Sequence, residues 1–354
     1  MKKIVLTGGG TAGHVTPNIA LLPALQAAGY EIAYVGSYEG IEKKLIADFN
    51  IPYTGISTGK FRRYLDPKNF SDPFRVMKGF VEARNYLKNY QPDVVFSKGG
   101  FVSVPVVRAA ASLHIPCIIH ESDMTPGLAN KLCIPVAEKV CCNFPETMKN
   151  IPADKAVLTG SPIRAELAEG SKLAGLNMCG FTANKPVIMV IGGSLGAANV
   201  NKAVRDALPK LLEDFQVVHL CGKDKIDNLL LNTPGYKQFE YIKAELKDIF
   251  AMADIVVSRA GANAICELLA LKKPNLLIPL SAGASRGDQI LNARSFEAQG
   301  FSMVIDEDYL SPGLLIEKVH ALYCSRQTYI DAMGKSRQTN AIPSILEIIN
   351  EITG

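Results

Sequence analysis

The chain has 354 residues, with 48% hydrophobic and 20% charged side chains, which excludes an intrinsically disordered protein. Its length favours two domains over a single core, and no apolar run reaches the ~18 residues of a membrane-spanning helix. The formal net charge is only +4, and the chain turns to glycine by residue 8, too early for a signal peptide, so we expect a cytoplasmic protein.

The cysteines and histidines give no sign of a metal site. The eight cysteines include no C-x-x-C pair, and the five histidines lack metal-binding spacing. In a reducing cytoplasm we expect the cysteines to be small buried apolar residues, without disulfides or zinc.

The chain opens with a strand, a glycine loop and a helix. Residues 2–7 predict the strand, residues 8–14 the glycine-rich turn, and Pro17 suits the first turn of a helix that runs to about Ala28. A second strand follows at residues 31–35. This unit resembles a dinucleotide fingerprint, but its spacing differs, and no acidic residue caps the second strand. We therefore expect no nicotinamide cofactor.

The alternation of helices and strands continues to the end of a first domain near Thr159. Apolar strands are predicted at residues 94–96 and 117–120, followed by Lys98-Gly99-Gly100 and by Glu121-Ser122-Asp123. Residues 160–184 then have the mixed character of a connector.

A second domain begins with a new strand, glycine loop and helix, at residues 186–191, 192–197 and 198–212. Further strands are predicted at residues 217–220, 255–257 and 276–278. We predict an α/β protein with two Rossmann-like, doubly wound parallel-sheet domains facing across a cleft. The expected boundaries are 1–160, 161–340 and an amphipathic tail, 341–354, which could pack back on the first domain.

Residues 254–289 form the most informative stretch of the second domain. A β-branched strand leads through Arg259-Ala260-Gly261 into a helix predicted at residues 262–271. The amides at the start of that helix suit a phosphate, and Glu267 could accept hydrogen bonds from both ribose hydroxyls. The alternative is an ordinary βαβ repeat with a solvated glutamate.

Several such elements together favour a nucleoside diphosphate. Residues 11–13, residues 192–194, Arg164 and residues 262–267 could each contact an anionic sugar nucleotide, although each alone is a weak signal. The chain lacks a Walker lysine motif, which favours binding by backbone amides and one arginine.

The motifs as a set resemble glycosyltransferase family 28. They are GGGTAGH at residues 8–14, HESD at 120–123, PGLANK at 126–131, GSPIR at 160–164, GGSLGA at 192–197 and SRAGA at 258–262. The resemblance covers essentially the whole chain. It implies the GT-B fold and inverting transfer of N-acetylglucosamine from UDP-GlcNAc to lipid I in peptidoglycan synthesis, with no metal or other cofactor.

The resemblance also implies site residues. The expected substrate-binding positions are Thr11, Ala12 and Gly13 near the sugar and acceptor, Asn130 nearby, Arg164 and Ser194 at the diphosphate, Ile242 at uracil, Ala262, Asn263, Ala264, Ile265, Cys266 and Glu267 at diphosphate and ribose, and Asp288 and Gln289 at the N-acetylglucosamine hydroxyls. Some relatives carry Asn where this chain has Asp123, and a carboxylate close to a diphosphate would be unfavourable.

Transfer requires a base that takes the proton of the acceptor hydroxyl. A histidine with an ordinary pKa near ~6.5 suits this role, which makes His14 the first candidate and Glu121 the second. The alternatives are that His14 orders its loop or binds the acceptor diphosphate, and that Glu121 is a structural partner of a backbone amide.

The first domain carries the positive charge. Residues 1–163 hold 18 Lys and Arg against 13 Asp and Glu, a net charge of +5, and residues 60–88 hold eight basic and three acidic residues interleaved with aromatics. This excess is too small and local to favour nucleic acid, and it fits an anionic membrane surface that carries a lipid-linked acceptor. The alternative is a solvated helix face with core aromatics.

The expected setting is therefore peripheral, at the cytoplasmic face of the bacterial membrane, with other cell-wall synthesis proteins as further partners. Other functions remain open: a GT-B enzyme with another lipid acceptor such as diacylglycerol, a UDP-sugar epimerase, or a sugar-nucleotide-binding scaffold.

Overall fold

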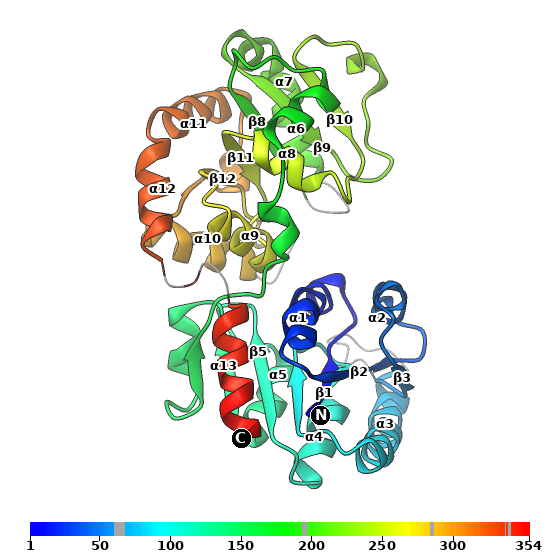
Figure 1. Ribbon diagram of the computed structural model, residues 1–354. Helices are drawn as coiled ribbons and strands as arrows, with labels where there is room; N and C mark the ends of the chain where they lie inside the picture. Colours follow the sequence, from blue (N-terminus) through cyan, green and yellow to red (C-terminus); the bar gives the residue numbers. More distant parts are fainter. Residues whose placement is uncertain (60–67, 193–196, 284–286, 337, 339–340) are drawn as a thin grey trace. The chain divides into compact units, whose positions relative to one another are not determined.

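The computed structural model describes residues 1–59, 68–192, 197–283, 287–336, 338 and 341–354, and for residues 68–73 it describes the helix but not the side chains. The chain forms two compact units (Figure 1). Unit 1 comprises Met1–Arg164 with Asn340–Gly354, and unit 2 comprises Ala165–Thr339.

Unit 1 is built on a parallel sheet of seven strands in the order β3-β2-β1-β4-β5-β6-β7. The strands are β1 Lys3–Thr7, β2 Glu31–Ser37, β3 Tyr53–Ile56, β4 Val94–Ser97, β5 Cys117–Glu121, β6 Lys139–Cys142 and β7 Ala156–Leu158. The α-helices are α1 Thr16–Ala27, α2 Ile41–Ile46, α3 Lys68–Tyr90, α4 Ser103–Ser112, α5 Leu128–Cys133 and α13 Ile342–Thr353.

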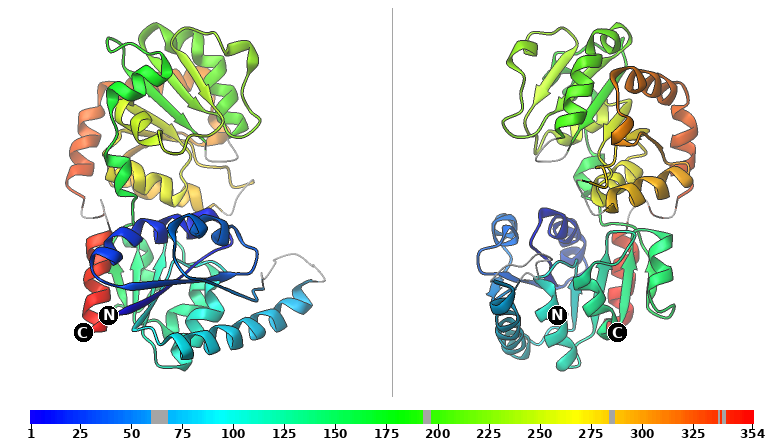
Figure 2. Two further views of the ribbon diagram at one scale, coloured as in Figure 1. Left: turned by 45° about the vertical axis from the view of Figure 1, so that its right-hand side comes forward. Right: turned by 180° about the vertical axis from the view of Figure 1, so that it is seen from behind.

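Alternate residues of these strands enter two different cores. Val5 and Val35 contribute to the core under α3 and α4, whereas Ile4 and Leu6 contribute to the core under α1 and α13. Successive side chains of a strand point to opposite faces, so a strand covered on both sides must be apolar at nearly every position. The continuous apolar runs of the sequence have this cause, and Figure 2 shows the helices on the two faces of the sheet.

The C-terminal helix belongs to unit 1. Ile345 and Ile349 of α13 are fully buried against α1, and the Tyr30 hydroxyl donates a hydrogen bond of 2.8 Å to Asn350 Oδ1. The apolar stripe of the tail is thus part of the first core.

Unit 2 repeats the same winding with six parallel strands in the order β10-β9-β8-β11-β12-β13. The strands are β8 Val187–Ile191, β9 Gln216–Leu220, β10 Tyr236–Phe239, β11 Ile255–Ser258, β12 Asn275–Leu277 and β13 Ser302–Val304. The α-helices are α6 Lys172–Cys179, α7 Ala198–Asp214, α8 Leu246–Met252, α9 Ala262–Ala270, α10 Asp288–Ala298, α11 Pro312–Cys324 and α12 Arg326–Gly334.

The strand orders confirm the prediction of two doubly wound parallel sheets. The order reverses between β1 and β4 in unit 1 and between β8 and β11 in unit 2. Ligands of such sheets lie outside the carboxyl ends of the strands at these reversal points. Within the described ranges, no helix is long and apolar enough to cross a membrane.

Seven of the eight cysteines are buried, as expected, and burial raises the pKa of the Cys141 thiol to about 12. Cys324 at the end of α11 is exposed, so the expectation of burial was wrong for this one residue.

Candidate active site

In unit 1 the loops after β1 and β4 meet at the reversal point. The Gly9 amide donates to the Gly99 carbonyl at 3.4 Å. Gly100 has φ +83°, and a Cβ on it would lie 2.2 Å from the Gly9 carbonyl oxygen, so a larger residue cannot replace it without moving the loop. This contact brings His14 beside the second loop.

His14 lies in a short 3₁₀ turn, Ala12–His14, between the glycine loop and α1. Its Nδ1 lies 3.0 Å from the Thr11 hydroxyl oxygen. Burial, reinforced by the nearby Lys98 ammonium, lowers the pKa of His14 to about 4, although a hydrogen bond with Gly9 and the charge of Glu42 oppose the shift. The expectation of an ordinary histidine pKa was therefore wrong, because partial burial disfavours the charged form of the ring. His14 is neutral near pH 7 and can accept a proton.

Lys98 is a buried cation whose place in the sequence indicated only a loop. It is 1% exposed, its amide donates to the Thr7 carbonyl at 2.9 Å, and its ammonium donates to the Ser122 hydroxyl. Burial, together with the charge of Lys98, holds the pKa of His120 well below its ordinary value. His120 Nε2 lies 2.9 Å from the Gly160 carbonyl oxygen. Lys98 thus places a positive charge at this reversal point.

Glu121 is buried, and its carboxylate binds three donors of its own chain. These are the Asp123 amide at 2.9 Å, the Gly127 amide at 3.1 Å and Asn130 Nδ2 at 2.8 Å. Burial raises the pKa of Glu121, although the hydrogen bonds from Asp123 and Asn130 oppose this. The contacts favour the structural alternative for Glu121, which shapes the loop between β5 and α5.

Asn130 lies in α5, which follows β5, and Arg164 lies in the segment after β7. Asn130 is buried and its Nδ2 also donates to the His120 carbonyl at 3.2 Å, which fixes the amide plane. Arg164 is partly buried and is the last residue of unit 1, directly after the buried Ser161 and Ile163.

In unit 2 the candidate donor site is the junction of β11 and α9. Gly261 is the extended N-cap of α9, and the first amide bonded back into the helix is that of Ile265, to the Gly261 carbonyl at 3.1 Å. The three amides of residues 262–264 therefore precede the helical hydrogen-bond ladder and carry the positive end of the helix dipole. Ile265 and Cys266 are buried in the core, so they contribute backbone rather than side chains. Glu267 is partly buried, one turn further along.

Three more predicted donor residues lie in a loop and at a helix start of unit 2. Ile242 is buried between β10 and α8. Asp288 and Gln289 open α10, and Gln289 Oε1 accepts the Leu280 amide at 3.0 Å, which orients its side-chain amide. Ser194 lies outside the described residues.

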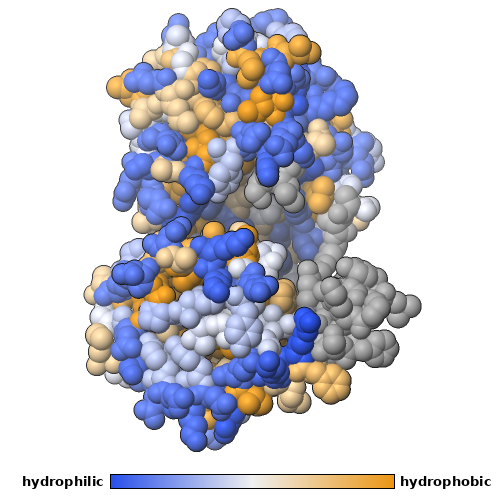
Figure 3. Space-filling view, turned by 90° about the vertical axis from the view of Figure 1, so that its right-hand side faces the viewer, coloured by the Kyte–Doolittle hydropathy of each residue, from blue (hydrophilic) through white to orange (hydrophobic). Residues whose placement is uncertain are grey.

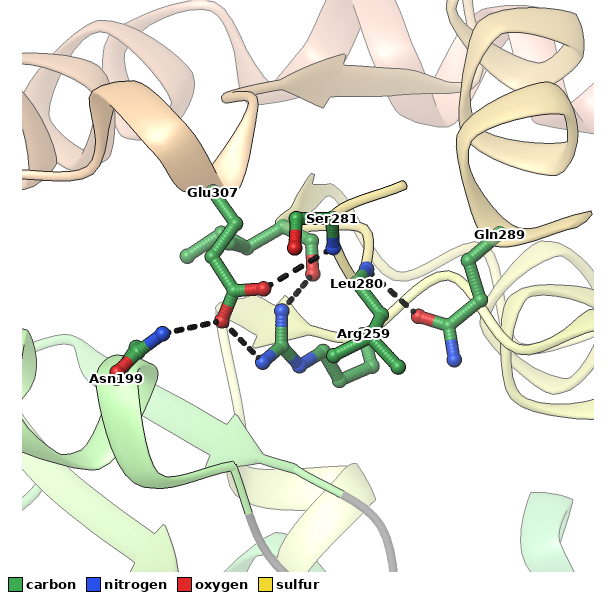
Figure 4. Close-up of polar contacts among 7 residues, drawn as sticks. Asn199, Arg259, Leu280, Ser281, Gln289 and Glu307 are labelled. Carbon is green, nitrogen blue, oxygen red and sulfur yellow. Dashed lines mark hydrogen bonds and ion pairs between the residues drawn. The ribbon is translucent and has the colours of Figure 1, made fainter. Parts of the chain in front are cut away.

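A buried ion pair ties these loops together (Figure 4). Arg259 Nη2 lies 2.5 Å from Glu307 Oε1, with only 12% and 5% of the two side chains exposed. The Ser281 amide and Asn199 Nδ2 also donate to this carboxylate, and Arg259 Nη1 donates to the Ile278 carbonyl at 3.0 Å. One pair thus joins the loops after β11, β12 and β13 to the start of α7.

Residues 4–142 match the model of the glycosyltransferase family 28 N-terminal domain, and residues 187–349 match that of the C-terminal domain. The chain belongs to glycosyltransferase family 28. A family 28 relative from Lachnospira eligens is 65% identical over 351 residues, which cover 99% of both chains. A relative from Clostridium botulinum is 57% identical and covers 100% of both. Both are named UDP-N-acetylglucosamine–N-acetylmuramyl-(pentapeptide) pyrophosphoryl-undecaprenol N-acetylglucosamine transferase.

Solved structures agree with the family 28 assignment. MurG of Acinetobacter baumannii matches with a TM-score of 0.79 at 27% identity, covering 99% of this chain and 100% of that one. This confirms the GT-B fold class. A UDP-GlcNAc 2-epimerase of Neisseria meningitidis, bound to UDP-GlcNAc, matches with a TM-score of 0.69 at 15% identity over 99% and 100% of the chains, a likeness of fold alone.

Reasoning from the sequence motifs of this family 28 protein did not identify several buried charged residues. Lys98 follows a strand, as many solvated lysines do, and the sequence around Arg259 indicates only a turn. Glu307 lies in no motif, 48 residues after its partner Arg259. The only local signal was the position of Lys98 and Arg259 directly after the apolar strands β4 and β11, at the ends where ligands bind.

Proposed function

We propose that the protein transfers N-acetylglucosamine from UDP-GlcNAc to the 4-hydroxyl of the N-acetylmuramoyl sugar of lipid I, with inversion, giving lipid II and UDP. The observation that carries this proposal is the 65% identity, over 99% of both chains, to a relative named for this transfer. Residues 1–160 serve the acceptor, residues 161–340 bind the donor, and residues 341–354 complete the first domain.

The donor diphosphate lies at the start of α9, where the amides of residues 262–264 point out of the helix end. Oriented amides stabilise the charge that develops on the leaving UDP, and removing one such donor typically costs about 2.7–4 kcal/mol of barrier. Arg164 and Ser194 add contacts to the diphosphate. Glu267 accepts the ribose hydroxyls, Ile242 meets the uracil through its backbone, and Asp288 and Gln289 bind the sugar hydroxyls.

The acceptor oxygen attacks the anomeric carbon from the side opposite UDP. A new C–O bond forms while the bond from the anomeric carbon to the phosphate oxygen breaks, and its electron pair leaves with UDP. His14, which the low pKa keeps neutral, takes the hydroxyl proton. Thr11 orients the ring through Nδ1, and Ala12, Gly13 and Asn130 line the acceptor side. Glu121 supports this loop cluster through its three hydrogen bonds.

The first unit binds the membrane surface peripherally through α3, at the cytoplasmic face. Phe74, Met77 and Val81 share one face of this helix and are 79%, 65% and 50% exposed. Arg75 and Lys78 beside them are also exposed, and Figure 3 shows this side of unit 1, with apolar and hydrophilic residues adjoining. A few basic contacts with shallow apolar burial suit an interface where neither alone would hold the protein.

The alternative for this stretch is a solvated helix face with aromatic residues in the core, and the aromatic residues of α3 fit it only in part. Phe80 packs against the core under α3 and α4, as that alternative requires, but Phe74 is exposed. The basic residues at positions 60, 62 and 63 lie outside the described part of the chain, and the side chain of Lys68 does too.

The test is a reconstituted reaction. Purified protein is given UDP-GlcNAc and a short-chain lipid I analogue without added metal, and products are identified by mass and by proton NMR, which distinguishes anomers and epimers. We expect UDP and a β-linked disaccharide product in equal amounts. Equal use of ADP-linked or GDP-linked sugar would contradict the uracil assignment. UDP-GlcNAc converted to its epimer, or no transfer to the muramoyl acceptor, would contradict the proposed function.

A further inference from the structure

Glu42 in α2 carries a carboxylate that solvent does not reach. Its exposure is 0%, and both oxygens accept hydrogen bonds from the protein. The Gly10 amide donates to Oε2 at 3.2 Å, the Ser37 amide donates to Oε1 at 3.0 Å, and the Ser37 hydroxyl also donates to Oε1. The donors come from the loop after β1 and from the end of β2, so one side chain joins the two.

Three glycines make room for this carboxylate. A Cβ on Gly9 would lie 2.6 Å from Glu42 Cδ, one on Gly36 would lie 2.8 Å from Cγ, and one on Gly40 would lie 2.1 Å from Oε1. Each contact would force the neighbouring side chain to move, and at Gly36 the Tyr53 hydroxyl would lie closer still, at 2.3 Å. Three separate positions of the chain thus leave the space that this one buried acid occupies.

Glu42 lies beside the glycine loop that follows the first strand of the sheet. In a doubly wound sheet, the glycine loop after the first strand normally presents amides to a ligand phosphate. Here the Gly10 amide already binds the chain's own carboxylate. No acidic residue directly follows β2 to bind a ribose; Glu42, five residues beyond Ser37, instead folds back onto the loop itself.

The same loop leads directly into the proposed base. Thr11 follows Gly10, its hydroxyl lies 3.0 Å from His14 Nδ1, and its carbonyl accepts the His14 amide at 3.1 Å. Fixing the Gly10 amide therefore fixes the start of the turn that holds the imidazole. On the other side of the loop, a Cβ on Gly10 would lie 2.5 Å from the Phe101 ring. The loop is held between an acid and an aromatic ring.

We propose that Glu42 is a positioning residue of the transfer reaction: its carboxylate occupies the anion position of the first glycine loop and holds the residue 11–14 turn in the shape in which His14 accepts the proton. This inference rests on the proposed function for its catalytic part. The loop-fixing part stands without it.

The first test compares Glu42→Gln with Glu39→Gln, an exposed acid of the same β2 to α2 connection. We expect Glu42→Gln to lower kcat by about 100-fold, the typical cost of a 1 Å misplacement, with KM for UDP-GlcNAc within twofold of wild type. Amide exchange of residues 9–14 should become faster. Glu39→Gln should match wild type in both.

The second test uses chemical rescue. Glu42→Ala leaves a space the size of acetate beside the Gly10 amide, so acetate should raise its kcat at least tenfold and slow its amide exchange. Chloride at equal ionic strength should not. The wild type should respond to neither salt.

A folded Glu42→Gln protein with wild-type kcat and wild-type exchange at residues 9–14 would overturn the proposal. So would a fall in kcat that acetate fails to reverse in folded Glu42→Ala. If neither variant folds, Ser37→Ala tests the proposal, because it removes one hydrogen bond to Glu42 and keeps the buried charge. We expect faster amide exchange at residues 9–14 and a lower kcat. Wild-type exchange and kcat in this variant would refute the role of Glu42. Absence of transfer by wild type would reject the proposed function but leave the exchange measurements valid.

Discussion

Removing Glu307 should destabilise unit 2 and weaken donor binding. The variant Glu307→Ala takes the carboxylate from Arg259, whose side chain is only 12% exposed, and leaves the buried guanidinium with the Ile278 carbonyl as its acceptor among the described residues. Breaking a buried pair by removing one partner typically costs about 3–5 kcal/mol. The Ser281 amide and Asn199 each lose a hydrogen bond to this carboxylate as well, so we expect the upper part of that range.

Chemical denaturation and calorimetry measure the two effects. Urea unfolding followed by far-UV circular dichroism should show the unit 2 transition at lower urea, and titration calorimetry should show UDP affinity reduced about tenfold or more, because the loops after β11 and β12 lose a shared anchor. The double variant Arg259→Met, Glu307→Leu removes both charges. It should lose less stability than Glu307→Ala, since no charge remains buried and unpaired.

The pH dependence has a definite sign. Burial raises the pKa of Glu307, but the hydrogen bonds from Arg259 and the Ser281 amide outweigh it and hold the pKa below the ordinary value. A carboxyl whose pKa is lowered by folding stabilises the protein above its unfolded pKa of ~4.3, and the contribution disappears as the pH falls through the folded pKa. The stability gap between wild type and Glu307→Ala should therefore be full at pH 7 and shrink below about pH 4. A gap under about 1 kcal/mol at pH 7 would refute the reasoning, because it would equal that of an exposed pair.

The other predictions concern the base, the ribose and the membrane. His14→Ala should lower kcat by about 10²–10⁴-fold with KM for UDP-GlcNAc unchanged, and its pH–rate profile should lose the acidic limb; a retained limb would assign the base elsewhere. Lys98→Met should move that limb to higher pH, because the ammonium helps lower the His14 pKa. Glu267→Ala should weaken UDP binding about tenfold by calorimetry, and unchanged binding would make it an ordinary helix residue. Replacing Phe74 and Lys78 by Ser should reduce salt-sensitive sedimentation with anionic vesicles. The same variant should lose activity on an acceptor embedded in vesicles but keep its activity on a short-chain acceptor. Equal losses of activity on both acceptors would reject the membrane role.

The sequence by itself determined the fold class and where its ligands would be sought. The β-branched runs mark strands buried on both faces, and a glycine loop after β1, after β4 and after β8 marks the reversal points of two sheets. These signals are local, because a strand, its turn and the next helix are consecutive in the chain. The order of the motifs along the chain was by itself specific enough to indicate the family.

The tertiary structure alone decided what the charged residues do. Glu42 meets the Gly10 amide across 32 positions, and Glu307 meets Arg259 across 48, so no local pattern could pair them. The low pKa of His14 likewise depends on its burial and on Lys98 after β4, whereas the three hydrogen bonds to Glu121 come from residues 123–130 of its own β5–α5 connection. A charge can stay buried only where partners satisfy it, and for Glu42 and Glu307 those partners come from distant segments that the crossovers of the sheet bring together.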